Sequence, residues 1–334
     1  MTIERRGLRP DDVLIDIAYT GICHSDIHSA RGEWGKALFP MVPGHEITGV
    51  VAEVGDEVTA HRVGDRVGVG YMVDSCGSCA YCLEGTEQFC LLGHVRTYNS
   101  RGYDDLVTDG GYSRRIVVRD RFVCPLPEGV DLAAGAPLLC AGITTYSPLR
   151  RWGTGDGMSV AVVGLGGLGH MAVKLATAMG AEVTVLSRGP KKEDDALRLG
   201  ARDFFDTQDP ATLCTQRGRF DLIVNTVSAG LPLDAYLKTL RTGGAMALVG
   251  LPGAPLSFDA ASLVDGNAVL AGSLVGGTAQ LREMLDFCAA HGIGADVEIV
   301  CADEINDAYA RVESGDVRYR LVLDASTIGA GEAA

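Results

Sequence analysis

The chain has 334 residues, of which 47% are hydrophobic, and its formal net charge is −14. This length allows two domains, and the acidic charge argues against a nucleic-acid backbone or an anionic membrane as a partner. The sequence has neither the apolar core of a signal peptide nor an apolar run that could span a bilayer. We therefore expect a cytoplasmic protein whose ten cysteines bind metal rather than form disulfides.

The first predicted strand covers residues 12–20, DVLIDIAYT, in which apolar and polar residues alternate. The segment GICHSDIH follows it directly. Its Cys23 offers a thiolate, a soft ligand that suits zinc, and Ser25 and His28 are close enough in sequence to serve the same site. Taken alone, Cys23 would more often be a buried packing residue.

A histidine and a second cysteine complete a possible ligand set. A Pro-Gly turn precedes a strand that His45 opens, with Glu46 beside it. Cys140 lies in PLLCAG, within a segment that predicts the start of a helix. Cys23, His45 and Cys140 form a three-ligand zinc set that leaves a fourth position for water or substrate.

Four further cysteines follow the spacing C-x2-C-x2-C-x7-C. Four thiolates so spaced can surround one tetrahedral zinc ion and leave no open position, which is typical of a structural site. The predicted ligands are Cys76, Cys79, Cys82 and Cys90.

The middle of the chain carries a dinucleotide-binding pattern. Residues 160–163 predict a buried parallel strand, and residues 170–179 follow with helical spacing. The intervening GLGGLG matches G-x-G-x-x-G in its strand–turn–helix context. The first glycine permits a tight turn, the second lets backbone N–H groups approach a pyrophosphate, and the third lets helix and strand pack closely. The predicted cofactor loop consists of Gly164, Leu165, Gly166, Gly167, Leu168 and Gly169.

The next strand, at residues 182–186, indicates which dinucleotide binds. An NAD site usually has an acidic residue at the end of this strand, where it holds the ribose 2′-hydroxyl. This chain has Ser187 and Arg188 there, followed by Lys191 and Lys192. A 2′-phosphate would meet cations instead of a repelling carboxylate, so we predict NADP(H).

The rest of the chain predicts a parallel sheet and a return to the first domain. Ligands of such a sheet bind at the carboxyl ends of its strands, and Val249 lies at one such end. A helix at residues 281–290 and a strand at residues 320–324 close the chain. The further strands of the sheet are predicted at residues 221–227, 245–251 and 268–276.

In these segments the chain resembles the zinc-dependent medium-chain alcohol dehydrogenases, and within them the cinnamyl alcohol dehydrogenase-like branch. The resemblance implies an α/β fold. A GroES-like, mostly-β catalytic domain would comprise residues 1–140 and 279–334, and a doubly wound, parallel-sheet Rossmann domain residues 141–278. The matching motifs run through nearly the whole chain in the family's order: GICHSDIH, VPGHEITGVV, VGDRVGVG, the four-cysteine segment, TYNSRG, GGYS, PLLCAGITTY, VVGLGGLGH and DVRYRLVLD.

The resemblance also implies a reaction and a set of roles. A primary alcohol and an aldehyde are interconverted by hydride transfer with NADP(H), with one zinc ion as Lewis acid and a second as structural ion. Ser25, the cofactor ribose and His28 relay the proton. Glu46 either binds the zinc or tunes it from beside the ligand set. Thr144 and Arg320 contact the cofactor.

The resemblance says less about substrate and assembly. Plant cinnamyl alcohol dehydrogenases have Trp near the position of Arg96 and Phe at that of Leu274. Trp34 is a further candidate for the pocket wall. The weaker aromatic clamp favours a broad-specificity aldehyde reductase over a lignin enzyme. Family members are often dimers, and residues 268–276 would supply the joining edge strand.

Three other functions are compatible with part of these motifs. A polyol dehydrogenase of the same superfamily stays open, because only a substrate panel separates it. A zinc-free quinone reductase is disfavoured, since Cys23, His45 and Cys140 are all present. A nucleic-acid-binding zinc ribbon is opposed by the acidic charge and the dinucleotide motif.

Overall fold

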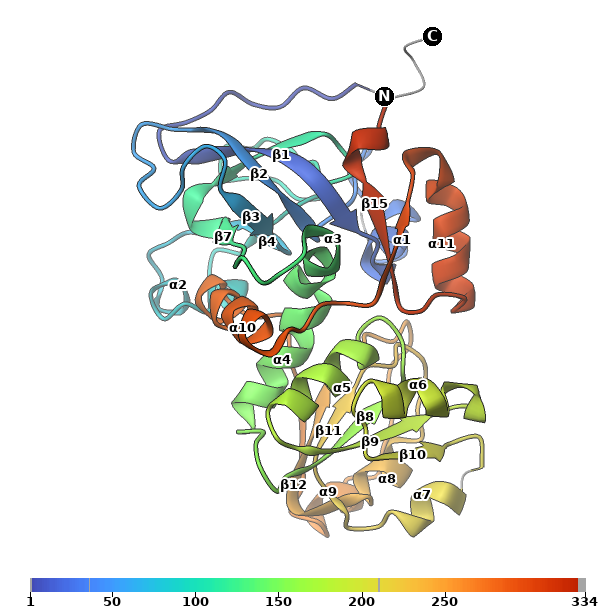
Figure 1. Cartoon of the computed structure of the whole chain (residues 1–334). Coiled ribbons are helices and arrows are strands. Elements are labelled where there is room, and N and C mark those ends of the chain that lie inside the picture. Colours follow the sequence, from blue (N-terminus) through green and yellow to red (C-terminus); the bar gives the residue numbers. More distant parts are fainter. Residues whose placement is uncertain (1, 36, 210, 330–334) are drawn as a thin grey trace. The chain divides into compact units, whose positions relative to one another are not determined.

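The structure is a computed structural model that describes residues 2–35, 37–209 and 211–329. The chain folds into two compact units, whose elements are labelled in Figure 1. One unit contains the described residues up to Ile143 together with those from Gly276 onward, and the other is Thr144–Val275.

The first unit is built on a seven-stranded sheet in the order β14-β15-β1-β2-β3-β7. The remaining strand, β6, pairs with residues 12–16 of β1, whereas β15 pairs with residues 19–21. Its neighbours are antiparallel except for β14 and β15, which are parallel. The strands are β1 (Asp12–Gly21), β2 (Ile47–Val54), β3 (Arg66–Val69), β6 (Arg115–Arg119), β7 (Cys124–Pro125), β14 (Val297–Val300) and β15 (Arg320–Asp324).

Strand β1 is the centre of this sheet, and its sequence explains why. Val13, Ile15 and Ile17 occupy every second position of the strand and are all buried in one core cluster with Ile47 of β2. The predicted strand over residues 12–20 is therefore confirmed. Its far end pairs with β15, as Thr20 lies opposite Leu323, so the last strand of the chain joins the first.

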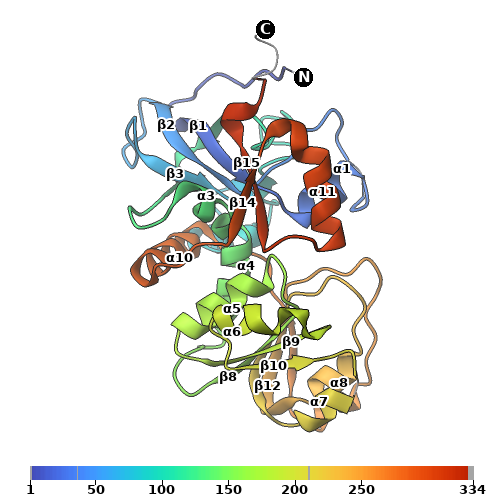
Figure 2. The same ribbon diagram turned by 45° about the vertical axis from the view of Figure 1, so that its right-hand side comes forward.

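Helices and a small hairpin complete the first unit. Figure 2 shows α11 lying along β14 and β15, where Ala308 packs against Val300 and Leu321. The hairpin consists of β4 (Met72–Asp74) and β5 (Val95–Arg96). The α-helices are α1 (His24–Ala30), α2 (Ala80–Leu83), α3 (Leu132–Gly135), α4 (Ala141–Arg151, which continues into the second unit), α10 (Thr278–His291) and α11 (Ile305–Ser314). The short 3-10 helices are η1 (Glu87–Phe89), η2 (Asp120–Phe122), η3 (Ala136–Leu139), η5 (Ala302–Glu304) and η6 (Ala325–Thr327).

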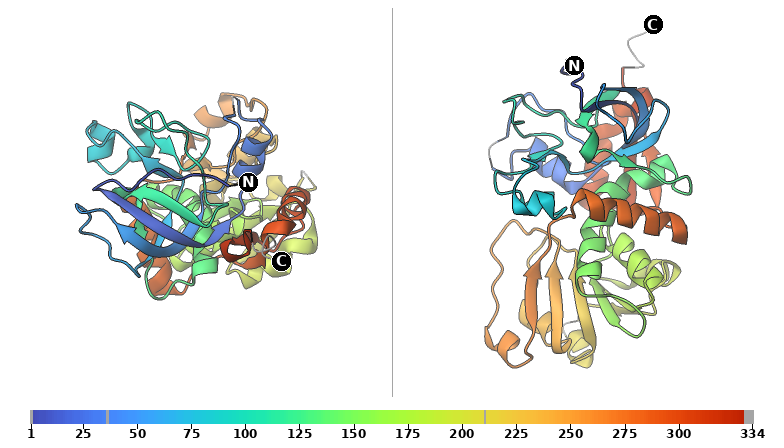
Figure 3. Two further views of the ribbon diagram at one scale, coloured as in Figure 1. Left: turned by 90° about the horizontal axis from the view of Figure 1, so that it is seen from above. Right: turned by 90° about the vertical axis from the view of Figure 1, so that its left-hand side faces the viewer.

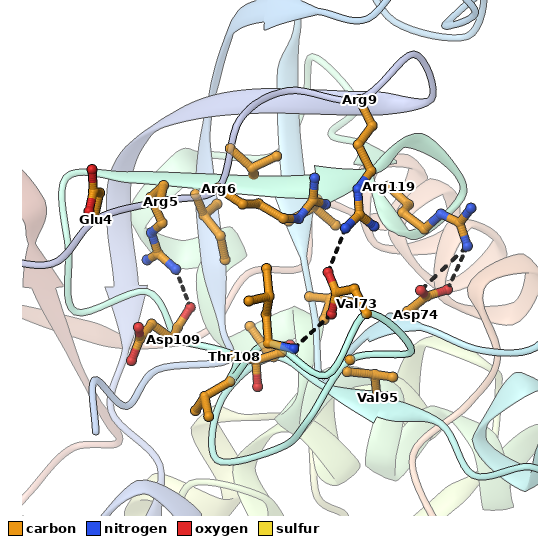
Figure 4. Close-up of a pocket in the computed structure, with 18 residues that line it drawn as sticks. Glu4, Arg5, Arg6, Arg9, Val73, Asp74, Val95, Thr108, Asp109 and Arg119 are labelled. Carbon is orange, nitrogen blue, oxygen red and sulfur yellow. Dashed lines mark hydrogen bonds and ion pairs between the residues drawn. The ribbon is translucent and has the colours of Figure 1, made fainter. Parts of the chain in front are cut away.

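A polar cavity of about 200 Å³ lies beneath the N-terminal segment of the first unit (Figure 4). Arg9 pairs with Asp104 at 2.6 Å, and Arg119 pairs with Asp74 at 3.1 Å. Arg5 donates to backbone carbonyls of the opposite wall. Because these cations are matched by acceptors within the cavity, their contacts tie its walls together and leave no excess charge for a ligand.

The second unit is a parallel sheet in the order β10-β9-β8-β11-β12-β13. The right-hand view of Figure 3 shows its strands side by side. The strand order reverses between β8 and β11, which is the point where doubly wound sheets bind their ligands. The strands are β8 (Ser159–Val163), β9 (Glu182–Ser187), β10 (Asp203–Asp206), β11 (Phe220–Asn225), β12 (Leu240–Leu248) and β13 (Val269–Gly272). The helices are α5 (Gly169–Ala178), η4 (Pro190–Lys192), α6 (Glu193–Arg198), α7 (Ala211–Thr215), α8 (Leu233–Leu237) and α9 (Ala261–Val264).

This architecture confirms the expected α/β fold, and three local expectations need correction. The strand predicted at residues 268–276 is β13, which is only Val269–Gly272. His45 does not open a strand, because β2 begins at Ile47. The helix start predicted around Cys140 is a 3-10 turn followed by α4, and Cys140 lies between the two.

Within the described residues, no single helix has both the length and the apolar character of a membrane span. One pair, Leu132–Leu139 and Ala141–Arg151, meets the criteria of length and composition together, with a bend of 55° between its parts.

Candidate active site and metal centres

The start of α1 fixes the first candidate ligand. Cys23 is the extended residue just before the helix, with φ −111° and ψ 150°. Asp26, three residues on, accepts a hydrogen bond from the backbone N–H of Cys23 at 2.9 Å. This capping arrangement satisfies an N–H group at the helix start, and it fixes the half-buried Cys23 at that end of the helix.

The Pro-Gly turn places His45 against the same carboxylate. Gly44 has φ +103°, and a Cβ there would lie 2.8 Å from the ring of Tyr112, so only glycine fits. His45 Nδ1 lies 3.1 Å from Oδ1 of Asp26, which is fully buried. Tyr112 donates its hydroxyl to the other carboxylate oxygen at 3.3 Å. Asp26 thus orients the imidazole, a role that its sequence context does not reveal.

Cys140 completes the set. Its Sγ lies 3.2 Å from Nε2 of His45, and the ligand atoms of Cys23, His45, Glu46 and Cys140 all lie within 4.8 Å of one another. Zinc bonds of about 2.3 Å to sulfur and about 2.0–2.1 Å to nitrogen place tetrahedral ligand atoms about 3.5–3.8 Å apart. The donor set and its spacing therefore fit a zinc ion.

The three groups shift one another's pKa values. Hydrogen bonding with Cys140 lowers the pKa of the Cys23 thiol well below its usual value, although burial opposes this. The same bond, together with burial, raises the pKa of Cys140 well above its usual value. Burial disfavours the charged form of His45, but Asp26 and Cys23 raise its pKa well above the usual value. A metal ion would displace these protons on binding.

Glu46 belongs to the same cluster but is held by Arg320. Nη2 of Arg320 lies 2.5 Å from both carboxylate oxygens and donates to the carbonyl of Ile22 at 3.0 Å. Burial raises the pKa of Glu46 to about 7, while Arg320 works in the opposite direction. A Cβ on Gly21 would lie 2.0 Å from Glu46 Oε2, so the pair requires glycine there. The predicted contact of Arg320 with the cofactor stays a prediction.

Ser25 and His28 lie on the same short helix as Cys23. Ser25 Oγ is 3.5 Å from Cys23 Sγ, and His28 lies one turn further on the same face. The ring of His28 stacks on Trp34 with a centroid distance of 4.9 Å, and its Nδ1 lies 2.5 Å from a carboxylate oxygen of Glu33. Its side chain is 30% exposed, so it can exchange protons with solvent.

A narrow pocket opens beside His45 within the first unit. Tyr98 forms part of its wall and donates its hydroxyl to the carbonyl of Ser25 at 3.0 Å. Tyr71 meets the imidazole of His45 edge-on, with a centroid distance of 6.1 Å. We name this the His45 pocket; its lining includes Ser25, Trp34, His45, Tyr71, Arg96 and Tyr98.

The four-cysteine lobe also converges. The ligand atoms of Cys76, Cys79, Cys82 and Cys90 lie within 4.8 Å of one another. Sγ of Cys82 is 3.8 Å from that of Cys76 and 3.5 Å from that of Cys79, close to the spacing of about 3.8 Å expected between thiolates around one zinc. Backbone N–H groups of Ser78 and Cys79 lower the pKa of Cys76 to about 6. The lobe therefore fits a closed zinc site.

The glycine loop of the second unit has the predicted geometry. Gly164 has φ +87°. A Cβ on Gly169 would lie 2.1 Å from the carbonyl oxygen of Gly164, whereas one on Gly166 would meet nothing within 4 Å. The loop thus packs tightly at its ends and is open at its centre, where a pyrophosphate could approach. Leu165, Gly167 and Leu168 lie within the same turn before α5.

One of the predicted selectivity residues contacts this loop. Ser187 ends β9 and is buried, while Arg188 and Lys191 are exposed. Lys192 donates from Nζ to the carbonyl oxygen of Leu165 at 2.9 Å, so a lysine lies directly at the loop. Outside this group, Val249 follows β12 and Thr144 is buried in α4. Their contacts with a cofactor stay predictions.

Two family models match the chain. The alcohol dehydrogenase GroES-like domain matches residues 9–128, and zinc-binding dehydrogenase matches residues 167–290. A probable formaldehyde dehydrogenase of Bacillus subtilis is 59% identical over 327 residues, covering 98% of this chain and 94% of that protein. An NADP-dependent alcohol dehydrogenase C of Mycolicibacterium smegmatis is 55% identical over 328 residues, with the same coverage of 98% and 94%.

Two solved structures are also similar to this chain. A cinnamyl alcohol dehydrogenase from Sorghum bicolor has a TM-score of 0.95 and 44% identity, over 97% of this chain and 93% of that one. The CAD of Helicobacter pylori, solved in complex with NADP(H), has a TM-score of 0.91 and 43% identity, over 96% and 92% of the two chains.

Proposed function

Since the chain belongs to the zinc-dependent medium-chain alcohol dehydrogenases, in their cinnamyl alcohol dehydrogenase-like branch, we propose that it interconverts primary alcohols and aldehydes with NADP(H). The alcohol loses a hydride to NADP⁺ and a proton to solvent, and the reverse reaction returns both to the aldehyde. The observation that carries this proposal is the convergence of Cys23, His45 and Cys140 around one point.

These three residues would hold the catalytic zinc. When bound, the ion supplies Lewis acidity, which lowers the pKa of a hydroxyl and polarises a carbonyl. Asp26 keeps Nε2 of His45 free for the metal by accepting a hydrogen bond from Nδ1. Glu46 adds a negative charge beside the set, and Arg320 holds that charge in place. We assign Cys76, Cys79, Cys82 and Cys90 to a structural zinc.

NADP(H) supplies and accepts the hydride, and the second unit would bind it. The open centre of the glycine loop and the lysine at its edge suit a phosphate group. Ser187, Arg188 and Lys191 provide no carboxylate where a 2′-phosphate would lie. Support also comes from relatives that are named NADP-dependent and from one solved with NADP(H).

Two residues of α1 would handle the proton. The hydroxyl of Ser25 can both accept and donate, and it lies beside the ligand set. The imidazole of His28 can take up a proton at one nitrogen and release one from the other, and its side chain reaches solvent. We propose that Ser25 receives the substrate proton and that His28 delivers it outside.

The enzyme is further proposed to be a cytoplasmic homodimer without a nucleic-acid or membrane partner. The net charge of −14 would repel both surfaces. Strand β13 ends the parallel sheet, and Val269 on it is 46% exposed. Pairing of two such edges would cover it. Light scattering after size-exclusion chromatography tests the dimer, and the mass of a monomer would contradict the proposed homodimer.

The direct test is a panel of alcohols, aldehydes and polyols, followed by NADPH absorbance, with zinc measured on the same sample. We expect aldehyde reduction with NADPH to exceed that with NADH. Faster turnover of polyols than of primary alcohols would favour the polyol dehydrogenase alternative. A zinc-loaded sample with no turnover of any of them would contradict the proposal.

A further inference from the structure

The His45 pocket contains a cation that no ligand set explains. Two basic residues are among the described residues that line it. His45 belongs to the candidate zinc ligands, and the other is Arg96. It is half-buried and belongs to β5, which pairs with β4. Its position in the pocket wall makes it a neighbour of whatever occupies the space beside His45.

Strand geometry places this side chain on the pocket side of the hairpin. Successive side chains of a strand point to opposite sides. Val95, the residue before Arg96, is buried against the N-terminal cavity (Figure 4). Arg96 therefore points to the other side of the hairpin, where the His45 pocket lies.

The guanidinium is largely unused. Nη2 donates to the carbonyl oxygen of Asn99 at 2.7 Å, and Arg96 forms no ion pair with any residue that the structure describes. This contrasts with Arg9 and Arg119 on the opposite side of the hairpin, which are paired with carboxylates. A half-buried cation with spare N–H groups is best satisfied by an anion.

We propose that Arg96 selects aldehydes and alcohols whose far end carries a carboxylate. This inference rests on the proposed function, because the reacting end would lie at Cys23, His45 and Cys140. A planar carboxylate matches the guanidinium fork with two parallel hydrogen bonds. The carboxylate takes no part in the hydride transfer and leaves unchanged.

The test compares matched substrates that differ only in this charge. Succinic semialdehyde and its methyl ester form one pair, and 4-formylbenzoate and its methyl ester form another. We expect kcat/KM of the intact enzyme with NADPH to favour each acid, and Arg96→Met to reduce that preference about tenfold to a hundredfold. The loss should fall on KM, because the far end is held equally in ground and transition states. Arg96→Lys should restore part of it.

Arg101→Met is the matched control, since Arg101 is exposed, pairs with Asp105 and does not line the pocket. Its preference should equal that of the wild type. Zinc content and the unfolding temperature establish that each variant is folded. A preference unchanged in Arg96→Met, or absent from the wild type, would overturn the proposal.

A binding measurement separates this proposal from the proposed function. In 4-carbamoylbenzoate the amide occupies the reacting end and the carboxylate the far end, and terephthalamide is its neutral partner. Calorimetry with the zinc-loaded protein should show tighter binding of the acid, which Arg96→Met abolishes. If no aldehyde is turned over, the proposed function fails, yet this titration still decides on Arg96. Equal affinities of the acid for wild type and Arg96→Met would overturn the role of Arg96.

Discussion

The buried carboxylate of Asp26 lies 3.1 Å from Nδ1 of His45. Because a carboxylate only accepts hydrogen bonds, Nδ1 carries a proton, and Nε2 faces Sγ of Cys140 at 3.2 Å. Because the same carboxylate caps the helix that begins after Cys23, one residue positions two candidate ligands.

Asp26→Asn should weaken the metal site without removing a ligand. An amide cannot accept at both positions as the carboxylate does, so His45 loses its fixed tautomer. We expect zinc affinity at this site to fall about 10–100-fold, the range for such supporting groups. Competition with a chelator measures it. Asp16→Asn, which changes an exposed acid on β1 that pairs with Arg115, is the control. Equal zinc retention in both variants would contradict the role of Asp26.

Cys79→Ser should empty the four-cysteine lobe and spare the other site. A serine oxygen is a poor replacement for a thiolate ligand of zinc, so we expect zinc content to fall from two ions to one per chain. The unfolding temperature should drop by about 5 °C or more. Cys214→Ser, at an exposed thiol, should change neither quantity. Two zinc ions retained in Cys79→Ser would show that the lobe is not a metal site.

Ser187→Asp should change the preferred dinucleotide. A carboxylate at the end of β9 would repel a 2′-phosphate and accept a hydrogen bond from a ribose 2′-hydroxyl. We expect the ratio of kcat/KM for NADPH over NADH to fall by at least about tenfold. Thr215→Asp, which adds the same charge at the end of α7, controls for net charge. A wild type that prefers NADH would refute the assignment before any variant is made.

Ser25→Ala should slow turnover while zinc is kept. Loss of one positioned acid–base group costs roughly 10²–10⁴-fold in rate. Metal analysis of the same preparation shows whether the effect is chemical, because Ser25 lies near Cys23 but is not in the ligand set. A variant as fast as the wild type would exclude Ser25 from proton transfer.

The chemistry of the site could be predicted from local patterns, because the metal-ligating residues and the glycine spacing each lie within short segments of the sequence. The four-cysteine lobe and the loop at Gly164 are of this kind. The pairing of Arg320 with Glu46 is not, since the two are 274 residues apart and meet only because β15 lies beside β1. The role of Asp26 could not be predicted for a related reason. The sequence around Asp26 indicates only a helix cap. Its contact with His45 depends on the turn at Gly44.

The central claim is that Cys23, His45 and Cys140 hold a zinc ion without which aldehydes are not reduced. The most direct measurement is zinc content and NADPH-dependent aldehyde reduction on the same samples of wild type and Cys140→Ser. We predict two zinc ions and turnover for the wild type, and one zinc ion with turnover reduced at least about a hundredfold for the variant. A Cys140→Ser protein that keeps both zinc ions, or that loses one and reduces aldehydes at the wild-type rate, would contradict the account.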